Sequence, residues 1–314
     1  IEVERRYICK SNSLVDLADY GLPVTSDSAK MIIDYLRLYE FENMKNIPVT
    51  EVANQLGWNK EMSCFLFGET CLQPTCEIDP IAELDKETSW SNRPVVFIGK
   101  DEGENQISAS LHSKGSCDAW ASGINQTYEF PVVQFTVYTS LTAPFLKIFE
   151  SENFSFEISS PTSTGKTSAL QIAASCWGKP DESYGGFFRT WKTTKTAIER
   201  AAQALNGIPL IMDDTKHAPG YDKNNRTSTP LVTDSIYMIS SGTGKSRGTL
   251  VGTEENTSFS TIMMSSGESP SIDLTNDGGS RGRIISLWGL PFKDQSEKLN
   301  RFISKLDKVF ANNY

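Results

Sequence analysis

Residues 154–177 read FSFEISSPTSTGKTSALQIAASCW, and this stretch decides the fold. Its first five residues are mostly apolar and predict a buried strand, and the Ala-, Leu- and Ile-rich run after Thr167 predicts a helix. Between them lies a loop that ends in Gly165-Lys166-Thr167. A strand, a loop of this kind and a helix, in this order, form the setting of a phosphate-binding P-loop.

The loop contains the groups that nucleotide binding requires. In a P-loop, backbone N–H groups and the helix N-terminus surround the phosphates, a lysine reaches the β- and γ-phosphates, and a hydroxyl holds Mg²⁺. Lys166 and Thr167 fill the last two roles, so we predict ATP and Mg²⁺ as ligands. The predicted nucleotide-binding residues are Ser160, Pro161, Thr162, Ser163, Thr164, Gly165, Lys166, Thr167 and Ser168. Ser160 replaces the first glycine of the motif.

A second Gly-Lys-Ser triplet occupies residues 244–246, but no predicted helix follows it. Such a short triplet occurs by chance in chains of this length. We therefore assign the nucleotide to Lys166 and not to Lys245.

Two acidic residues follow another predicted strand. Residues 208–212 are apolar and lead directly into Asp213 and Asp214. A P-loop enzyme needs one acid at a neighbouring strand end for Mg²⁺ and a second acid to orient the attacking water. We assign Asp213 to the metal and Asp214 to catalysis, although Glu, one methylene longer, is usual at the second position. The alternative is a buried strand that ends in a solvated acidic turn.

Three more residues are candidates for catalysis. Ser266 follows the apolar run 261–264, and a polar side chain at such a strand end can sense the γ-phosphate; a plain turn is the alternative. Arg281 and Arg283 lead into a predicted strand. An arginine from an adjacent subunit can stabilise the charge that builds on the γ-phosphate during transfer, whereas the alternative for both is ordinary surface charge.

Strands and helices alternate along the second half of the chain. Strands are predicted at residues 154–159, 187–191 and 209–213, and helices at residues 167–177 and 193–205. This alternation indicates an α/β fold with a parallel sheet and helices on both faces. We assign the P-loop ATPase core to residues 126–314. Within it, residues 130–149 combine strand-forming residues with helical spacing, and their length favours a helix kinked near Pro144.

The first 125 residues indicate a smaller α+β domain whose role the sequence does not reveal. Apolar spacings of three and four predict a helix after Ser26-Asp27, and a second, short helix is expected from Pro48 to Gly57. Short apolar runs at residues 64–67 and 95–98 predict strands.

Composition limits the class of protein. The 314-residue chain has six cysteines without a Cys-x-x-Cys pair and only two histidines, which argues against a zinc site. No apolar run reaches 18 residues, so no membrane span is expected. The missing leader fits a cytoplasmic protein, and the start at Ile1 suggests a piece of a longer one.

The net charge of -9 is distributed unevenly. Residues 1–150 carry 12 Lys and Arg against 22 Asp and Glu, a net of -10, whereas residues 151–314 carry 18 against 17, a net of +1. A DNA contact requires only a local basic strip, so the second half is compatible with a nucleic-acid partner.

The ordered set of motifs resembles a known group, the MCM-like, self-loading AAA+ helicases of staphylococcal cassette chromosomes and pathogenicity islands, with their relatives in a large bacterial P-loop family. The likeness is carried by residues 17–21 (LADYG), 56–58 (LGW), 163–167 (STGKT), 173–178 (AASCWG), 209–214 (PLIMDD), 237–247 (YMISSGTGKSR) and 265–268 (SSGE). These segments extend over about 250 residues.

The resemblance implies an AAA+ core in a homo-hexameric ring that moves on single-stranded or forked DNA, with origin DNA or replication proteins of a bacterial mobile element as further partners. It places residues 242–247 before a hairpin in the ring channel, so Lys245 and Arg247 are candidate DNA contacts; a flexible basic loop is the alternative. It also matches Arg281 to the MCM arginine finger and Arg283 to that of the closer family. The end at Tyr314 leaves little room for a C-terminal lid or winged helix.

The leading hypothesis is therefore an ATP-hydrolysing DNA helicase or translocase. One alternative is a P-loop ATPase that remodels protein partners, which the acidic first half would suit. The other is an ATP-binding origin scaffold with little turnover, which Ser160 and Asp214 favour.

Overall fold

The computed structural model describes most of the 314-residue chain. The described residues are 3, 5–47, 49–73, 95–183, 185–220, 230–244, 248–249, 252–253, 258–272, 278–293 and 296–314. The chain divides into two compact units, Ile1–Thr50 and Glu51–Tyr314.

The first unit is helical. Its elements are α1 (Arg5–Ile8), α2 (Ser11–Val15), the 3-10 helix η1 (Asp16–Tyr20) and α3 (Ala29–Asn43). The helix predicted after Ser26-Asp27 is confirmed as α3, although its N-cap residue is Ser28. The core of this unit consists of Leu14, Leu17, Val24 and Ala29.

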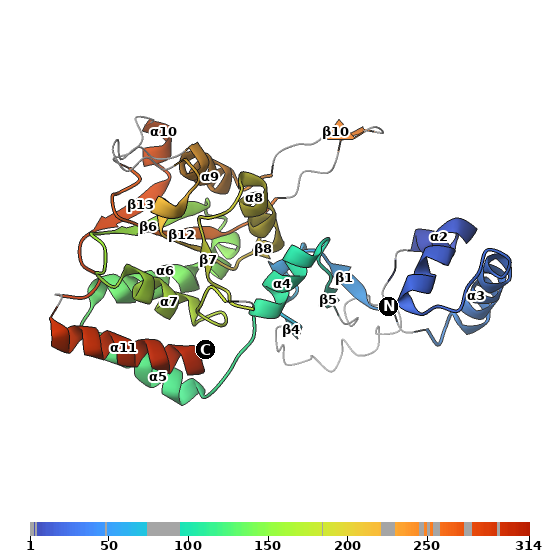
Figure 1. Ribbon diagram of the computed structural model, residues 1–314, viewed down its shortest axis with the longest axis horizontal. Helices are drawn as coiled ribbons and strands as arrows, with labels where there is room; N and C mark the ends of the chain where they lie inside the picture. The colour runs from blue at the N-terminus through green and yellow to red at the C-terminus, as the bar shows by residue number, and fades with distance from the viewer. Residues whose placement is uncertain are drawn as a thin grey trace, which may run out of the picture. The chain divides into compact units, whose positions relative to one another are not determined.

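A five-stranded parallel sheet forms the centre of the second unit (Figure 1). Its strands, in spatial order, are β13 (Ile284–Trp288), β6 (Phe154–Ser159), β12 (Ile262–Gly267), β9 (Leu210–Asp213) and β7 (Arg189–Thr190). One face is covered by α6 (Pro131–Ile148) and α7 (Lys166–Ala174), and the other by α8 (Lys195–Ala204) and α9 (Pro230–Ser241). The predicted α/β fold with helices on both faces is confirmed, and the interval 130–149 is helical as its spacing predicted.

A smaller sheet joins residues 51–73 to the same unit. It contains β2 (Leu56–Trp58), β3 (Phe65–Phe67), β4 (Thr70–Leu72) and β8 (Leu205–Asn206), and a separate pair is formed by β1 (Glu51–Ala53) and β5 (Val95–Phe97). The strands predicted at 64–67 and 95–98 are confirmed, but the helix predicted from Pro48 to Gly57 is wrong. Parallel pairing of β2 with β8, about 150 residues away in the chain, outweighs a local helical pattern because strand formation depends on tertiary context.

Residues 51–73 and 95–125 thus lie in the same compact unit as the P-loop. The division drawn from the sequence at residue 125 differs from this one, which falls after Thr50.

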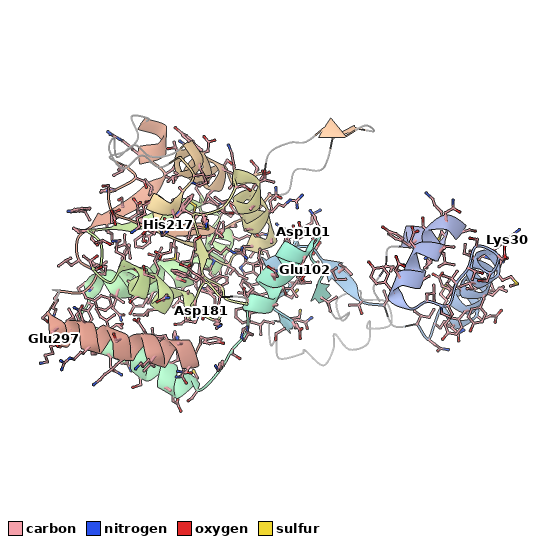
Figure 2. All side chains as sticks on the ribbon, in the orientation of Figure 1. Lys30, Asp101, Glu102, Asp181, His217 and Glu297 are labelled. Carbon is pink, nitrogen blue, oxygen red and sulfur yellow. The ribbon has the colours of Figure 1, made fainter. Side chains whose placement is uncertain are left out.

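Further elements complete the second unit. They are α4 (Glu102–Ser110), α5 (Cys117–Gln126), the 3-10 helix η4 (Thr215–His217), the hairpin β10 (Gly248–Thr249) and β11 (Gly252–Thr253), α10 (Gly278–Arg281) and α11 (Glu297–Asn312). Asp101 caps α4 by accepting a hydrogen bond from the Glu104 N–H (Figure 2). Within the described ranges, no helix is both long and apolar enough to cross a membrane.

Gly57 tests the pairing of β2 with β8. Its φ is +83°, and a Cβ atom there would lie 1.9 Å from the Asn206 carbonyl oxygen. We expect Gly57→Ala to lower the free energy of unfolding by about 3–5 kcal/mol, from left-handed strain plus overpacking. Gly220→Ala is the control, because Gly220 has the same φ of +83° with no described atom within 4 Å; it should cost about 1–2 kcal/mol. Urea unfolding measures both, and equal losses would contradict the close approach.

Candidate nucleotide-binding site

The P-loop begins where β6 ends and continues into the first turn of α7. Because β12 pairs with β6 on one side and β9 on the other, the C-terminal ends of these three parallel strands lie together. Gly165 is the N-cap of α7 with φ +88°, and a Cβ there would lie 2.7 Å from the Phe292 ring. Backbone conformation and close packing therefore both require this glycine.

Ser160 replaces the usual glycine without a left-handed backbone. Its hydroxyl lies 2.5 Å from the Thr164 hydroxyl, which in turn donates to the Pro161 carbonyl at 2.9 Å. Since Thr164 gives its only hydroxyl proton to Pro161, Ser160 is the donor of the shorter bond. Ser160 and Thr164 are buried, so these hydrogen bonds stabilise the loop on its buried side.

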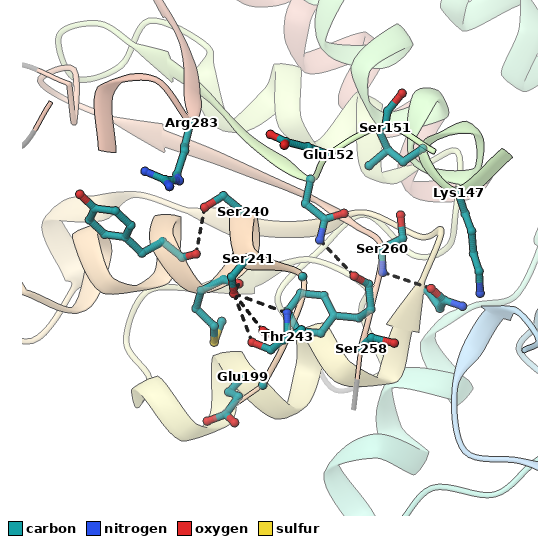
Figure 3. Close-up of a pocket in the computed structure, with 18 of the residues that line it drawn as sticks. Lys147, Ser151, Glu152, Glu199, Ser240, Ser241, Thr243, Ser258, Ser260 and Arg283 are labelled. Atoms are coloured by element: carbon teal, nitrogen blue, oxygen red, sulfur yellow. Dashed lines mark hydrogen bonds between the residues drawn. The ribbon is translucent and has the colours of Figure 1, made fainter. Parts of the chain in front are cut away.

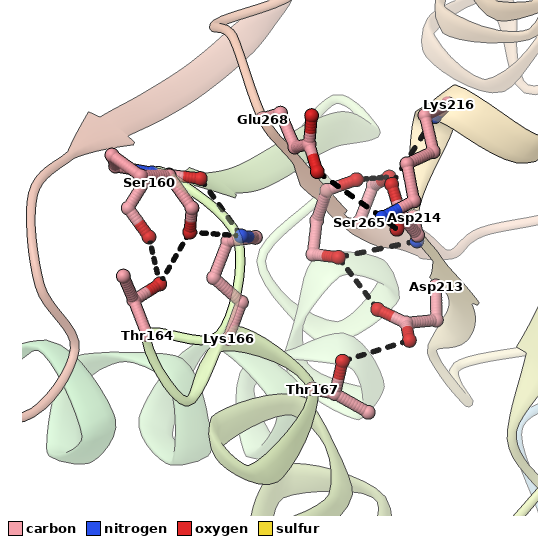
Figure 4. Close-up of polar contacts among 11 residues, drawn as sticks. Ser160, Thr164, Lys166, Thr167, Asp213, Asp214, Lys216, Ser265 and Glu268 are labelled. Carbon is pink, nitrogen blue, oxygen red and sulfur yellow. Dashed lines mark hydrogen bonds and ion pairs between the residues drawn. The ribbon is translucent and has the colours of Figure 1, made fainter.

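Lys166 lies across the loop. Its Nζ donates to the carbonyl oxygens of Ser160 and Pro161, each at 2.8 Å (Figure 4). Burial lowers the pKa of the Lys166 ammonium, and the nearby Asp214 and Glu268 carboxylates oppose that shift. A phosphate in the loop would offer this ammonium a charged acceptor in place of two neutral carbonyls.

Asp213 connects three elements. Thr167 donates its hydroxyl to one carboxylate oxygen of Asp213 at 2.9 Å (Figure 4). Ser266 donates its hydroxyl to the other oxygen at 2.5 Å. The backbone N–H of Asp214 donates to the same Ser266 hydroxyl at 3.1 Å. The structure therefore brings together the residues that the sequence assigned to metal binding, γ-phosphate sensing and water orientation.

The donors at this junction fit Mg²⁺. Hard divalent cations prefer carboxylate and hydroxyl oxygens and retain several waters. Thr167 and Asp213 present such oxygens beside the phosphate loop, and in the described part of the chain no cluster of three or more His, Cys, Asp or Glu residues offers another metal site.

A cation that the sequence analysis missed lies beside Asp214. Lys216 Nζ is 2.9 Å from Asp214 Oδ2 and 3.1 Å from Glu268 Oε1. The hydrogen bond with Asp214 is the main cause of the raised pKa of Lys216. Asp214 itself has a φ of +53°, an uncommon value for a residue other than glycine. The only signal in the sequence was a lysine two positions after the second acid, which is too weak to assign a role.

The loop and its partners surround a cavity of about 410 Å³. Its lining residues are Thr162, Ser163, Thr164, Gly165, Lys166, Thr167, Ser168, Asp214, Lys216, Ser266, Asn300, Ile303 and Ser304. Helix α11 supplies the last three and also provides Asp307, which accepts a hydrogen bond from the Ser168 hydroxyl at 3.2 Å. The C-terminal helix is thus a wall of the phosphate pocket, a role that its sequence did not indicate.

The two candidate arginines lie at the other end of the sheet. In the parallel register of β13 with β6, Ile284 is opposite Ser155 and Trp288 is opposite Ser159. At about 3.3 Å per residue, Arg283 is roughly 17 Å along the strands from the start of the phosphate loop. Neither arginine lines the 410 Å³ cavity. In one copy of the chain, Arg281 and Arg283 are directed to other partners.

Those partners are within the same chain. Arg281 Nε donates to the Ile272 carbonyl at 3.2 Å, and Arg283 Nη1 donates to the Gly279 carbonyl at 2.6 Å. The Arg283 guanidinium also lies 5.0 Å from the centre of the Tyr237 ring. Arg283 borders a second, larger cavity of about 1090 Å³, whose wall includes Thr243 and Lys147 (Figure 3).

The predicted DNA contacts Lys245 and Arg247 lie outside the described residues. Their described neighbours Thr243 and Gly244 border the larger cavity, and the hairpin of β10 and β11 follows them, where the resemblance implied one.

The fold and site together define the class. Numbered along the chain, the five strands of the parallel sheet lie in the order 5-1-4-3-2, with a P-loop after the first and an acid at the end of the third. This is the arrangement of a P-loop core with a parallel sheet and helices on both faces. The chain belongs to the family described as "Domain of unknown function (DUF927)", whose model matches residues 3–258.

A solved structure has a similar fold. It is titled "SCCmec type IV Cch - active helicase", and it superposes with a TM-score of 0.68 at 18% sequence identity. The match covers 98% of this chain and 52% of the other, so this chain spans about half the length of that protein. Among curated proteins, none matches the sequence significantly.

Asp307 gives the pocket wall a pH dependence. Burial raises the pKa of its carboxyl from 3.8, and one of its oxygens, Oδ1, is buried without a hydrogen bond. A raised pKa in the folded state means that ionisation opposes folding, so the penalty is absent at low pH and develops as the pH rises above about 4. We expect Asp307→Asn to have a higher Tm than the parent at pH 7 and a smaller advantage at pH 4, by thermal unfolding. A pH-independent difference would contradict this account.

Proposed function

We propose that this chain is an ATP-driven DNA helicase or translocase that works as a homo-hexameric ring in the replication of a bacterial mobile genetic element, in the cytoplasm. The observation that carries the proposal is the hydrogen-bonded set Thr167, Asp213 and Ser266 beside the buried Lys166. It unites a P-loop, a strand-end acid and a strand-end hydroxyl at one cavity. The similar fold of a protein titled an active helicase supports DNA as the track.

The residues divide the work of hydrolysis. Lys166 binds the β- and γ-phosphates, and Thr167 and Asp213 hold Mg²⁺, which when bound supplies positive charge to the phosphate oxygens. Asp214 orients the attacking water and accepts its proton, with Lys216 fixing the position of the carboxylate. Ser266 contacts both Asp213 and the Asp214 N–H, so it is placed to transmit the state of the γ-phosphate.

An arginine from a neighbouring copy completes the site in this proposal. The described wall of the cavity contains two ammonium groups, Lys166 and Lys216, and no guanidinium. Arg281 and Arg283 lie at the opposite end of their own sheet, so only a second copy can bring one of them to this nucleotide. Hydrolysis then depends on assembly into a ring.

Two substitutions separate binding from chemistry. Lys166→Ala should abolish ATP binding and turnover, because the phosphates lose their ammonium. Asp214→Asn should retain ATP binding and lose about 10²- to 10⁴-fold in turnover, the usual contribution of a general base. Steady-state hydrolysis is measured with and without single-stranded and forked DNA at low salt, beside nucleotide binding and sedimentation.

The DNA dependence decides between the proposed function and its alternatives. Turnover that requires Lys166 and rises with DNA supports the translocase. Turnover that requires Lys166 but is indifferent to DNA contradicts it and indicates an ATPase that remodels proteins. ATP binding without turnover in assembled rings indicates a scaffold.

Mixing variants identifies the trans arginine. If Arg281 or Arg283 acts across an interface, its Ala variant alone should lose about 10³-fold or more in turnover. Mixed in equal amounts with Lys166→Ala, it should regain activity, because about one interface in four then combines an intact P-loop with an intact arginine. Arg200→Ala, which removes an exposed guanidinium paired with Asp101, serves as the control that should not need rescue. No rescue with either arginine variant, despite mixed assembly, excludes a trans role for both.

A further inference from the structure

A third cavity, of about 340 Å³, lies against the edge strand β7. It shares no lining residue with the phosphate-loop cavity or with the larger cavity near Arg283. The residues relevant to its chemistry are Arg189 and Thr190 of β7, and Lys192 and Thr193 in the segment that leads to α8.

Arg189 is a half-buried cation without a counter-charge. In the described part of the chain no hydrogen bond or ion pair reaches its guanidinium, and burial alone lowers the pKa of Arg189. Glu182 also lines the cavity, but no ion pair joins it to Arg189, and its own pKa is raised by burial and by Asp213. By contrast, Arg200 on α8 pairs with Asp101 and Arg301 pairs with Glu297. A desolvated guanidinium without a partner is unfavourable, so the site is suited to an external anion.

Lys192 adds a second uncompensated charge at the same cavity. Its side chain is exposed, and within the described ranges its ammonium makes no ion pair. Its backbone N–H donates to the Thr190 hydroxyl at 3.2 Å, which fixes the turn after β7. A planar guanidinium with a neighbouring ammonium is a combination that recognises phosphate oxygens.

The position of the cavity separates its ligand from the hydrolysed nucleotide. β7 is three strands from β6, so at about 4.8 Å per strand the cavity is roughly 14 Å across the sheet from the phosphate loop. Thr190 is opposite Asp213 in the register of β7 and β9, so the cavity opens at the same end of the sheet as the P-loop. A volume of 340 Å³ has room for a phosphate group.

We propose that Arg189 and Lys192 bind a phosphate of the DNA backbone during translocation. This inference rests on the proposed function and adds a contact that is independent of Lys245 and Arg247. We assign the phosphate to the DNA backbone because contacts to backbone phosphates depend on charge and not on base sequence. A protein that moves along DNA requires contacts of this kind.

Salt-dependent DNA binding tests the site. Arg189→Gln should bind single-stranded DNA about tenfold more weakly at low salt, the usual effect of one charge-assisted hydrogen bond. The slope of log affinity against log salt should fall by about 0.7–1. Arg200→Gln removes the same charge from an exposed ion pair with Asp101 and should leave the slope unchanged. Fluorescence anisotropy measures the affinities.

Thermal unfolding without DNA supplies a second readout. Because Arg189 has no partner among the described residues, Arg189→Gln should have an equal or higher Tm than the parent. Lys192→Gln is exposed and should fold normally, with about threefold weaker DNA binding, so the site stays testable whatever Arg189→Gln does to stability.

Each other outcome overturns the inference in a recognisable way. If the parent chain binds DNA and Arg189→Gln binds it with the same affinity and salt slope, Arg189 does not contact DNA, and the proposed function is unaffected. A parent chain that binds no DNA removes both. A loss of assembly with unchanged DNA binding assigns Arg189 to a carboxylate of a second copy. A Tm increase in inorganic phosphate that requires Arg189, with unchanged DNA affinity, assigns the cavity to a free anion.

Discussion

The carboxylate of Asp213 is the junction on which the arrangement of the site depends. It is buried at the end of a central strand, and both of its oxygens accept hydrogen bonds, one from the first turn of α7 and one from the end of β12. Because the donors are neutral hydroxyls, they stabilise the negative charge of the Asp213 carboxylate by hydrogen bonding but do not neutralise it. These two hydrogen bonds fix the positions of β9, β12 and α7 relative to each other. They leave the negative charge of the Asp213 carboxylate available to a divalent cation.

The balance of charge around the cavity follows from this junction. Lys166 and Lys216 face three carboxylates, those of Asp213, Asp214 and Glu268. A nucleotide would add more negative charge to a site that is already slightly acidic, which explains why Mg²⁺ and an external arginine are both needed in the proposed mechanism. Lys216 joins Asp214, the acid proposed to orient water, to Glu268 in the loop after β12.

The acidic residues of the nucleotide site and the two candidate arginines lie at opposite ends of the parallel sheet. The phosphate loop, the acidic residues and the cavity of Arg189 and Lys192 lie at the C-terminal ends of the strands, whereas Arg281, Arg283 and the cavity of about 1090 Å³ lie toward the N-terminal ends. Parallel strands impose this polarity, because all their C-termini point the same way. A single copy therefore cannot apply its own Arg281 or Arg283 to its own nucleotide, and this separation is a reason to propose a ring.

The sequence by itself determined those parts of the fold and site that depend only on residues adjacent in the chain. The apolar run of β6, the Gly165-Lys166-Thr167 triplet and the first turn of α7 are neighbours in the chain, and Asp213 follows directly from the apolar strand before it. Local periodicity also sufficed for α6, despite its strand-forming residues. Only the tertiary structure decided that residues 51–53 and 56–58 form strands and that α11 lines the phosphate-loop cavity. It also decided that Lys216 joins Asp214 to Glu268 and that Arg189 has no partner among the described residues. The physical reason is that burial and pairing depend on contacts between residues far apart in the chain. A local sequence pattern does not specify which distant side chain a residue will contact after folding.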